Sequence, residues 1–422
     1  MDSQETVRVG AEIPAALAEP VEPVRARWIT LLFLANVGLW LAIYAPIQVV
    51  LPEQVQSLHP ADKAVLFSVV MAAGAIAFLL VNPVVGALSD RTTSPRGRRH
   101  PWTLAGALVG AAGLVVLAAA PDIPVMVLGW CIAQAGLGGM LATLTSALPD
   151  RVPAKQRGTL GGLIGISQML GTVLGALIVT VLVTKLSAGY LTCGVLVIAG
   201  ALAFTLRTPD EPLPVEFKPQ VPVSKMLRTL WVSPRQYPDF GWAWLTHFLV
   251  NLGNDLGTLY LLYFLADAAH YHDPQIGLLT LMALYAVALA IAGGVCGTAS
   301  DKSGRRKPFI VAAAIACAAA AAILVISPTW PAALAAAPLL GAGFGTYWAA
   351  APAVLTAVLP AASDRAKDLG MINIAYSLPL VIAPIIAGAV LGLMHNYPAL
   401  FALAGLASIA AGATITRVRS VG

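Results

Sequence analysis

Gly86-Ala-Leu-Ser-Asp90-Arg91 and, later in the chain, Gly297-Thr-Ala-Ser-Asp301-Lys302 are the two stretches that decide the fold. Each ends a long apolar segment, and a glycine, a basic cluster and a proline follow before the next apolar segment begins. The two aspartates stand half of the 422-residue chain apart. Leu148-Pro149-Asp150-Arg151 returns at the same offset as Leu359-Pro360, with Asp364-Arg365 after it. The sequence therefore predicts a duplication, with charged loops at the same places in each half.

The composition is that of a membrane protein. Hydrophobic residues make up 58% of the chain, charged residues 11%, and the mean hydropathy is +0.81. A soluble domain has about 25% charged residues. Apolar runs of about eighteen residues or more recur along the whole length, and each could cross a bilayer core as a helix. We expect an all-α integral membrane protein with twelve transmembrane helices in two parallel six-helix repeats, related by an axis along the membrane normal.

We divide the chain into five regions. Residues 1–27 are polar and acidic without a signal-peptide pattern, and we expect a disordered tail. Several prolines rule out a long continuous helix in the middle segment. The regions are the tail 1–27, a six-helix bundle over 28–206, a linker over 207–238, a second six-helix bundle over 239–416 and a tail over 417–422.

The basic residues predict the orientation. With an inside N-terminus, all of the 25 Lys and Arg residues except Lys63 and Lys185 fall on the inside, which is the positive-inside pattern. We therefore expect a multi-pass protein of the cell membrane with both termini cytoplasmic. Orientation and anionic lipid account for the net charge of +5, and we expect no nucleic-acid partner. The four cysteines fall inside spans at no metal-site spacing, and we expect no disulfide framework, metal or cofactor.

Two spans carry polar side chains at intervals of four residues, which places them on one helix face. These are Asn36, Trp40, Tyr44 and Gln48 in the first span and His247, Asn251 and Asp255 in the seventh. Such residues serve either as hydrogen-bonding contacts between helices or as the lining of a cavity, and we favour the cavity. A carboxyl near mid-bilayer is costly unless it faces a cavity or a partner, and desolvation disfavours its charged form. We expect Asp255, with His247, to bind a proton; the alternative is a buried, hydrogen-bonded carboxyl.

Other spans add candidate lining residues. We expect substrate contacts from Gln134, Tyr347, Trp348, Asn373 and Tyr376. Glycines and Pro352 make the tenth span deformable, which suits a moving gate or close packing. Gln168 in the fifth span is ambiguous, because the surrounding glycines mark that helix mainly for close packing.

The two charged loops predict a conformational latch. We expect each aspartate to accept hydrogen bonds from a neighbouring helix N-terminus, and the arginines to pair with acidic groups across the gap between the halves. Such contacts would hold one of two conformations. The alternative is that the charges only set topology. The latch residues are Asp90, Arg91, Arg98, Arg99, Asp301, Lys302, Arg305 and Arg306.

These loops resemble the signature loop of the major facilitator superfamily. The endings Gly97-Arg98-Arg99-His100-Pro101-Trp102 and Gly304-Arg305-Arg306-Lys307-Pro308-Phe309 are similar to those of sucrose-type proton symporters and of glycoside–pentoside–hexuronide:cation symporters. Asp364-Arg365-Ala-Lys367-Asp368-Leu-Gly370 also looks like that branch. The resemblance implies the major facilitator fold and proton- or cation-coupled sugar uptake by alternating access. It also implies a cavity lined by the first, fourth, seventh and tenth spans.

Two transport functions remain open. Aromatic faces and amides suit proton-coupled symport of a sugar or glycoside, whereas proton-coupled efflux of a hydrophobic drug or metabolite would use the aromatics equally and the amides less. A membrane enzyme or receptor is disfavoured, because we find no nucleophile–base constellation, phosphate loop or soluble domain. We expect a small-molecule substrate, protons or another coupling cation and membrane lipid as partners, and a monomeric protein.

Overall fold

The computed structural model describes residue 14 and residues 16–218, 235–358, 372 and 374–420. Within them, the first half of the chain forms one helical bundle. Its first span is interrupted by a π-helical turn that begins at Pro46, because Pro46 and Pro52 lack the N–H that a helix interior uses. The elements are α1 (Ala26–Ala45), η1 (Pro46–Val50), α2 (Leu51–Leu58), α3 (Lys63–Ser89), α4 (His100–Ala118), α5 (Ile123–Arg151), α6 (Ala154–Leu177), η2 (Ile178–Leu182) and α7 (Leu186–Arg207).

The second half repeats this pattern after a short 3-10 turn, η3 (Val215–Phe217). Its first span breaks after Thr258 and resumes at Leu261, and residues 374–377 are helical just before α15. The elements are α9 (Pro238–Thr258), α10 (Leu261–Asp267), α11 (Pro274–Ser303), α12 (Lys307–Ile326), α13 (Trp330–Ala357), α15 (Pro379–Met394) and α16 (Tyr397–Ile415).

The predicted all-α membrane class is confirmed. Eleven helical segments of the described chain are long and apolar enough to cross a membrane. The tenth predicted span, α13, has 28 residues and therefore ample length, but its Gly, Pro, Tyr and Trp residues make it less apolar. The tract between residues 359 and 371, which carries the second copy of the Leu-Pro loop, lies outside the described residues, as does most of the linker.

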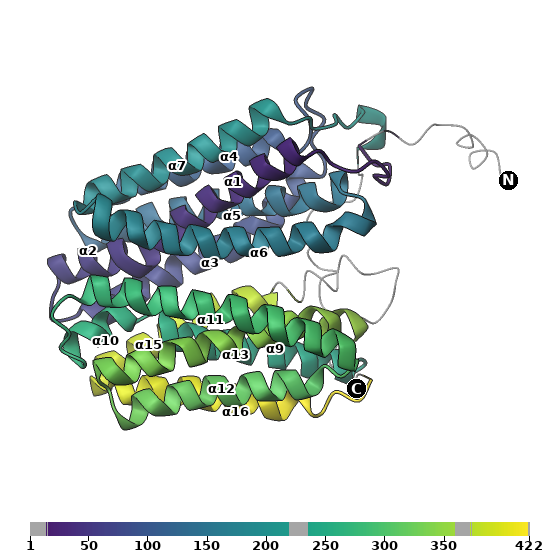
Figure 1. Cartoon of the computed structure of the whole chain (residues 1–422). Coiled ribbons are helices and arrows are strands. Elements are labelled where there is room, and N and C mark those ends of the chain that lie inside the picture. The colour runs from purple at the N-terminus through teal and green to yellow at the C-terminus, as the bar shows by residue number, and fades with distance from the viewer. Residues whose placement is uncertain (1–13, 15, 219–234, 359–371, 373, 421–422) are drawn as a thin grey trace.

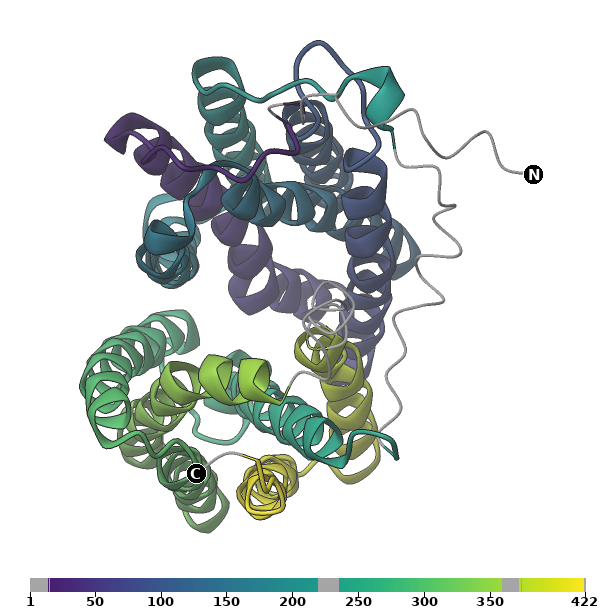
Figure 2. The ribbon, with the colours of Figure 1, turned by 90° about the vertical axis from the view of Figure 1, so that its right-hand side faces the viewer.

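The two bundles lie side by side (Figure 1). The start of α1 and the end of α16 lie at one end, which we call the proximal end, and α2 and α10 lie at the other, the distal end. Viewed from the proximal end, each bundle forms an arc of helices that faces the other (Figure 2). The cavity described below lies between these arcs.

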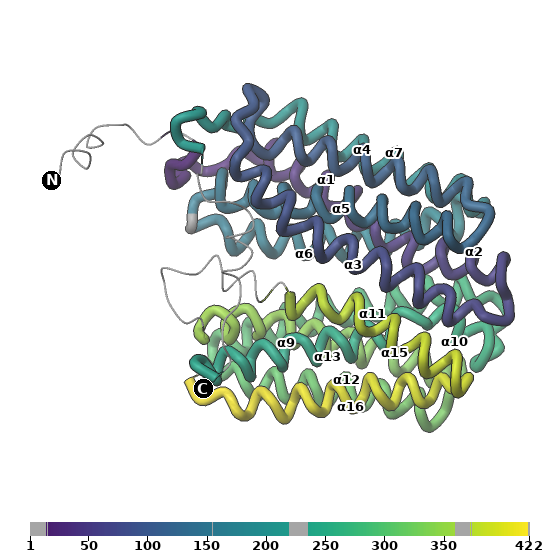
Figure 3. The backbone as a smooth tube through the Cα atoms, turned by 180° about the vertical axis from the view of Figure 1, so that it is seen from behind, coloured from purple at the N-terminus to yellow at the C-terminus, as the bar shows by residue number. Residues whose placement is uncertain are grey.

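The halves meet toward the distal end, where α3 packs against α15 (Figure 3). Gly388 of α15 permits this approach, because a Cβ there would collide with Ser68 of α3. Among the described residues, the hydrogen bonds and ion pairs between the halves lie from the middle of the spans to the distal end. They join Tyr44 and Gln168 to Tyr376, Ser68 to Tyr260, Pro52 to Tyr263, Glu53 to Gln275 and Lys63 to Asp267.

Candidate functional site

A cavity lies between the two halves near the middle of the spans. The first half supplies most of its wall from α1, η1, α3 and α5, and the second half supplies Tyr376 and Leu380. The cavity has about 470 Å³ of empty space, open solvent included, and is lined by Trp40, Ile43, Tyr44, Ile47, Met71, Ala75, Phe78, Gln134, Tyr376 and Leu380. It brings together four residues that the sequence predicted as substrate contacts: Trp40, Tyr44, Gln134 and Tyr376.

Two polar atoms in the lining have no partner in the protein. The indole Nε1 of Trp40 and the amide Oε1 of Gln134 are buried without a hydrogen bond. The two side chains are only 7% and 5% exposed. A buried polar atom without a partner is costly, so this pair needs an explanation. A ligand hydroxyl can accept a hydrogen bond from Trp40 Nε1 or donate one to Gln134 Oε1. The Trp40 ring, stacked on Tyr44 at 5.8 Å between centroids, adds a flat apolar face.

A polar bridge between the halves lies beside this pair. The Gln168 amide of α6 donates to the hydroxyls of Tyr44 and Tyr376, each at 3.4 Å. Both hydrogen bonds are longer than the usual length of about 2.9 Å and are therefore weak. The sequence had assigned the Gln168 helix mainly to close packing. That reading fits its distal part, where a Cβ at Gly171 or Gly175 would crowd α1, whereas Gly161 has open space around it.

His247 forms the centre of an aromatic cluster in the second half. Its Nδ1 lies 2.6 Å from the Tyr347 hydroxyl, and its ring contacts Trp348 edge-on at 5.5 Å. Its ring also stacks against Tyr376 at 6.5 Å, which connects the cluster to the cavity. Asn251 donates to the backbone carbonyl of His247 at 2.7 Å. Both His247 and Asn251 are buried, and neither of these two predicted residues lines the cavity.

Close approach of α11 and α13 fixes the position of this cluster. A Cβ at Gly341 or Gly345 would collide with the α11 backbone at Tyr285 or Leu289. Glycine at these positions therefore lets α13 lie directly on α11. Tyr347 and Trp348 come two and three residues after Gly345, so this packing holds both rings beside His247.

Asp255 lies on α9 about two turns beyond His247 and is half-buried. Its carboxylate bonds the Asn254 side chain, whose Oδ1 in turn accepts from the Tyr285 hydroxyl at 2.9 Å. Asp255 also interacts electrostatically with the hydroxyls of Tyr44 and Tyr376. These neighbours place the carboxyl close to the polar bridge between the halves. Asn254 and Tyr285 were not among the predicted site residues.

Three further predicted contacts are less central. Asn36 is buried outside the cavity lining and donates to the Leu32 carbonyl of its own helix at 2.9 Å, which is neither the expected cavity contact nor the alternative contact between helices. Gln48 lies in the π-helical turn, where its Oε1 is buried without a partner. Asn373 lies outside the described residues.

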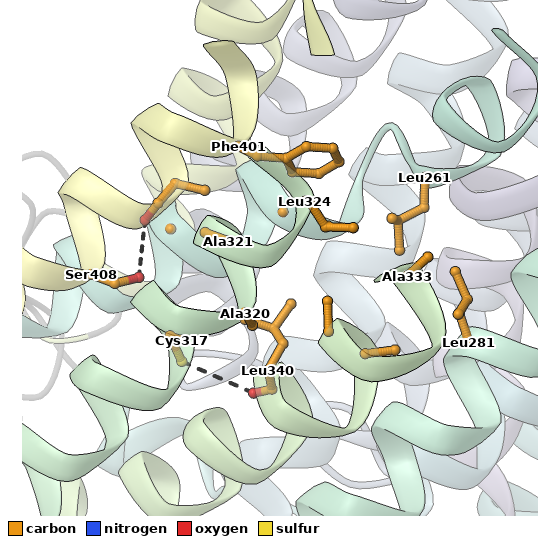
Figure 4. A pocket seen from close by; sticks show the side chains of 15 residues that line it. Leu261, Leu281, Cys317, Ala320, Ala321, Leu324, Ala333, Leu340, Phe401 and Ser408 are labelled. Carbon is orange, nitrogen blue, oxygen red and sulfur yellow. Dashed lines mark hydrogen bonds between the residues drawn. The ribbon is translucent and has the colours of Figure 1, made fainter. Parts of the chain in front are cut away.

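A second cavity lies inside the C-terminal bundle, among α9, α10, α11, α12, α13 and α16 (Figure 4). Glycine, alanine, leucine and phenylalanine side chains form nearly all of its lining. Its two polar side chains already donate hydrogen bonds, Ser408 to Ala404 and Cys317 to Leu340. None of the predicted site residues lines this cavity, and its polar groups are satisfied. The cavity between the halves is therefore the candidate site for a polar substrate.

The first charged loop forms a buried network within its own half. Arg99 pairs with Asp90 at 2.7 Å and with Asp150 of α5 at 2.7 Å, and Arg98 pairs with Asp150 at 2.8 Å. Burial lowers the pKa of the Arg99 guanidinium, but the Asp150 and Asp90 carboxylates more than reverse this, and its pKa is raised. The network locks α3, α4 and α5 together at the proximal end. Arg91 continues the turn after α3, with its N–H bonded to Leu88 O at 3.1 Å.

A different aspartate from the expected one occupies the helix N-terminus. The backbone N–H groups of Arg99 and His100, at the start of α4, donate to Asp210 at 2.6 and 2.8 Å. Asp210 follows α7 and approaches over Gly97, where φ is +87° and a Cβ would collide with the carboxyl. The expectation that Asp90 binds this terminus is therefore wrong. Asp210 binds it, and Asp90 forms an ion pair with Arg99 instead.

The second loop repeats the first in a reduced form. Arg306 pairs with Asp301 at 2.6 Å and donates to Ser300 at 2.9 Å. Gly304 has φ +65°, and Lys302 and Arg305 are exposed. Arg98, Arg99 and Arg306 thus pair within their own halves. Between residues that the structure describes, the expected pairing of these three arginines across the gap is not made.

The comparisons with known proteins agree with this architecture. The sequence matches the Major Facilitator Superfamily over residues 29–272 and again over residues 243–420. A general alpha-glucoside permease of Schizosaccharomyces pombe is 29% identical over 130 residues, a stretch that covers 26% of this chain and only 24% of the permease. A mutant of the nucleoside transporter NupG has a TM-score of 0.72, covering 93% of this chain and 98% of the other at 15% identity. That likeness shows the fold alone.

Six spans in each half of the described chain, a cavity between the halves and the match to the Major Facilitator Superfamily together indicate a membrane transporter rather than an enzyme. The match over nearly the whole chain then identifies the family: the protein belongs to the major facilitator superfamily.

Proposed function

We propose that this protein is a secondary active transporter that carries a sugar or glycoside across the cell membrane by alternating access, in symport with protons. The observation that carries the substrate class is the unpartnered pair of polar atoms in the central cavity, Trp40 Nε1 and Gln134 Oε1. A neutral polyol supplies acceptors and donors on one edge, and its C–H face stacks on an indole ring. The alpha-glucoside permease to which part of this chain is similar is named for a substrate that contains a sugar.

The basic loops support a cytoplasmic proximal end. Both signature loops, with Arg98, Arg99, Arg305 and Arg306, lie at that end. Because the contacts that the described residues make between the halves lie in the middle and at the distal end, we assign this conformation as the one that presents the cavity to the cytoplasm. Transport then requires a second conformation, in which the distal contacts separate and the proximal ends approach.

Asp255 is the proposed proton-coupling group, and His247 supports it from the same helix. The carboxyl lies within electrostatic reach of Tyr44 and Tyr376, the two hydroxyls that Gln168 bridges. A change in the charge of Asp255 therefore alters the electrostatic energy of Tyr44 and Tyr376, which lie where the two halves line the cavity. Substrate binding and protonation can thus act on the same equilibrium between two conformations.

Proton-coupled efflux of a hydrophobic compound is the second candidate, and one observation favours it. Most of the cavity lining is apolar, including Ile43, Ile47, Met71, Phe78 and Leu380. Such a wall would bind an apolar compound as well as the apolar part of a glycoside. The unpartnered amide oxygen of Gln134 supports the glycoside, because an apolar compound would leave it without a donor.

The test is proton movement in proteoliposomes that contain the purified protein and an enclosed pH dye. External addition of a small panel of sugars and glycosides should acidify the interior with one class of them, as proton symport requires. No response to any sugar, together with responses to lipophilic cations, would transfer the assignment to efflux. The controls are liposomes without the protein and proteoliposomes in which a protonophore has dissipated the proton gradient.

A further inference from the structure

We propose that Lys63 and Asp267 form a distal latch, an ion pair that holds the distal ends of the two halves together and sets how often the protein opens there. This inference rests on the alternating access proposed above, but on neither the substrate nor the coupling ion. It assigns a role to Lys63, one of the two basic residues that the positive-inside pattern leaves outside the cytoplasmic segments.

The pair joins the two halves directly. Lys63 is the first residue of α3 and Asp267 the last residue of α10, and Nζ lies 2.6 Å from Oδ1. The second carboxylate oxygen of Asp267 accepts from the Tyr397 hydroxyl at 2.7 Å. Both oxygens of Asp267 are thus occupied, one by each half. Tyr397 belongs to the first turn of α16, so it orients the carboxylate toward Lys63 from within the second half.

Lys63 is also held in place. Its ammonium lies 5.0 Å from the centroid of the Tyr263 ring and 3.2 Å from the Gln56 amide oxygen. Tyr263 itself donates to the Pro52 carbonyl of the other half at 2.7 Å. One cation therefore contacts a carboxylate, an aromatic face and an amide that converge from both sides of the gap.

The distal latch must break during transport, whereas the ion pairs of the signature loops can stay intact. The pairs of Arg99 and Arg306 join parts of the same half, and a rocking motion of rigid halves leaves them intact. Among the ion pairs between described residues, that of Lys63 and Asp267 is the one that joins the halves. It must break whenever the distal end opens, so its strength enters the equilibrium between the two conformations.

The exposure of the pair makes its effect measurable with salt. The Lys63 and Asp267 side chains are 15% and 35% exposed, so solvent ions reach the pair and screen it in part. Raising the ionic strength should therefore weaken the latch of the unmodified pair and shift the population toward a distally open conformation.

The experiment measures the distance between the halves at the distal end. Spin labels are placed at Ala61→Cys and His272→Cys, two exposed positions on opposite halves, after Cys131, Cys193, Cys296 and Cys317 are replaced by alanine. Pulsed electron–electron double resonance on the protein in nanodiscs then gives the populations of short and long distances between the two labels.

Lys63→Asp, or Asp267→Lys, should raise the ratio of the long-distance to the short-distance population by about three- to tenfold. The double exchange Lys63→Asp with Asp267→Lys should restore the short distance.

Lys185→Asp is the matched control. It makes the same charge change at the other basic residue on that side, which is exposed before α7. An equal shift with Lys185→Asp, or no recovery in the double exchange, would overturn the latch. If a charge-reversed chain does not fold, salt dependence replaces it: the shift with ionic strength should be present in the parent and absent in Lys63→Gln with Asp267→Asn. If the distance populations of the parent protein do not change with ionic strength, the latch is contradicted.

The readout separates the latch from the transport proposal, because it requires no transport. Distances that respond to an added sugar but not to the charge variants or salt would overturn the latch alone. Proton movement without any sugar response, alongside a latch that behaves as expected, would instead overturn only the proposed substrate.

Discussion

Arg99 and Arg306 make the same contact in the two halves of the molecule: each guanidinium binds both members of the Ser-Asp pair that ends the preceding helix. Arg99 lies 3.1 Å from Ser89 Oγ and 2.7 Å from Asp90, and Arg306 lies 2.9 Å from Ser300 Oγ and 2.6 Å from Asp301. The duplication is therefore preserved at the level of single hydrogen bonds. It holds although the first loop is four residues longer, because the extra residues lie between the two contact points.

The two copies differ in burial, and this predicts different effects on stability. Arg99 is 6% exposed and binds Asp150 as well, whereas Asp301 beside Arg306 is 71% exposed. Arg99→Ala leaves Asp150 and Asp90 without their shared partner and should lower the free energy of unfolding by about 3 kcal/mol. Arg306→Ala should cost about 1 kcal/mol or less. Thermal unfolding in detergent, followed by fluorescence-detected gel filtration, gives the melting temperature of each variant, which should fall further for Arg99→Ala than for Arg306→Ala.

Arg305→Ala is the control for this comparison, since Arg305 is exposed next to Arg306. Equal losses from Arg99→Ala and Arg306→Ala would mean that Asp150 does not strengthen the first copy.

The substrate proposal predicts that the indole N–H of Trp40 matters separately from its ring. Trp40→Phe keeps an aromatic face beside Tyr44 but removes the unpartnered donor. The loss of one hydrogen bond to a neutral substrate should raise KM about three- to tenfold with little change in stability. Transport of the sugar found in the proteoliposome assay gives KM.

Trp130→Phe is the matched control, because Trp130 also has a buried Nε1 without a partner but packs against Gly74 rather than lining the cavity. If both variants change KM equally, the donor of Trp40 is not a specific substrate contact.

The buried contact between His247 and Tyr347 predicts a structural effect in the second half. Tyr347→Phe leaves His247 Nδ1 without its 2.6 Å partner in a closed environment. The free energy of unfolding should fall by about 1–3 kcal/mol. Tyr271→Phe is the comparison, since that ring stacks on Trp330 and is partly exposed. Equal melting temperatures for the two variants would show that the His247 hydrogen bond adds little.

Much of the fold could be predicted because its signals are local. Span length, basic loops and the repeated Ser-Asp loop each lie within a short window of sequence, and the four-residue spacing on α1 led to Trp40 and Tyr44. The same spacing also selected Asn36, where the side chain instead bonds Leu32 of its own helix. Helical periodicity specifies a face of the helix, but not whether a cavity or a neighbouring helix lies against it.

Contacts between distant segments could not be predicted in this way. Asp150 and Asp210 reach the first loop from the ends of other helices, and Lys63 meets Asp267 across 204 positions. Gln168 was hidden by its glycine-rich surroundings, although it bridges Tyr44 and Tyr376. No spacing rule connects such residues, because the packing of whole helices determines which of them meet.

Proton coupling gives the sharpest prediction at a single residue. Asp255→Asn keeps the size of the side chain and its capacity to bond Asn254, but it cannot exchange a proton with solvent. The variant should retain expression and exchange of labelled substrate across the membrane, and lose accumulation driven by a pH gradient. Both are measured in the same proteoliposomes, with and without an imposed gradient.

Asp62→Asn is the control, because that carboxyl is exposed and makes no cap hydrogen bond to α3. Accumulation that survives in Asp255→Asn at the level of Asp62→Asn would remove Asp255 as the coupling site. Loss of both exchange and accumulation would instead assign it to substrate binding, since a group needed only for coupling leaves downhill exchange intact.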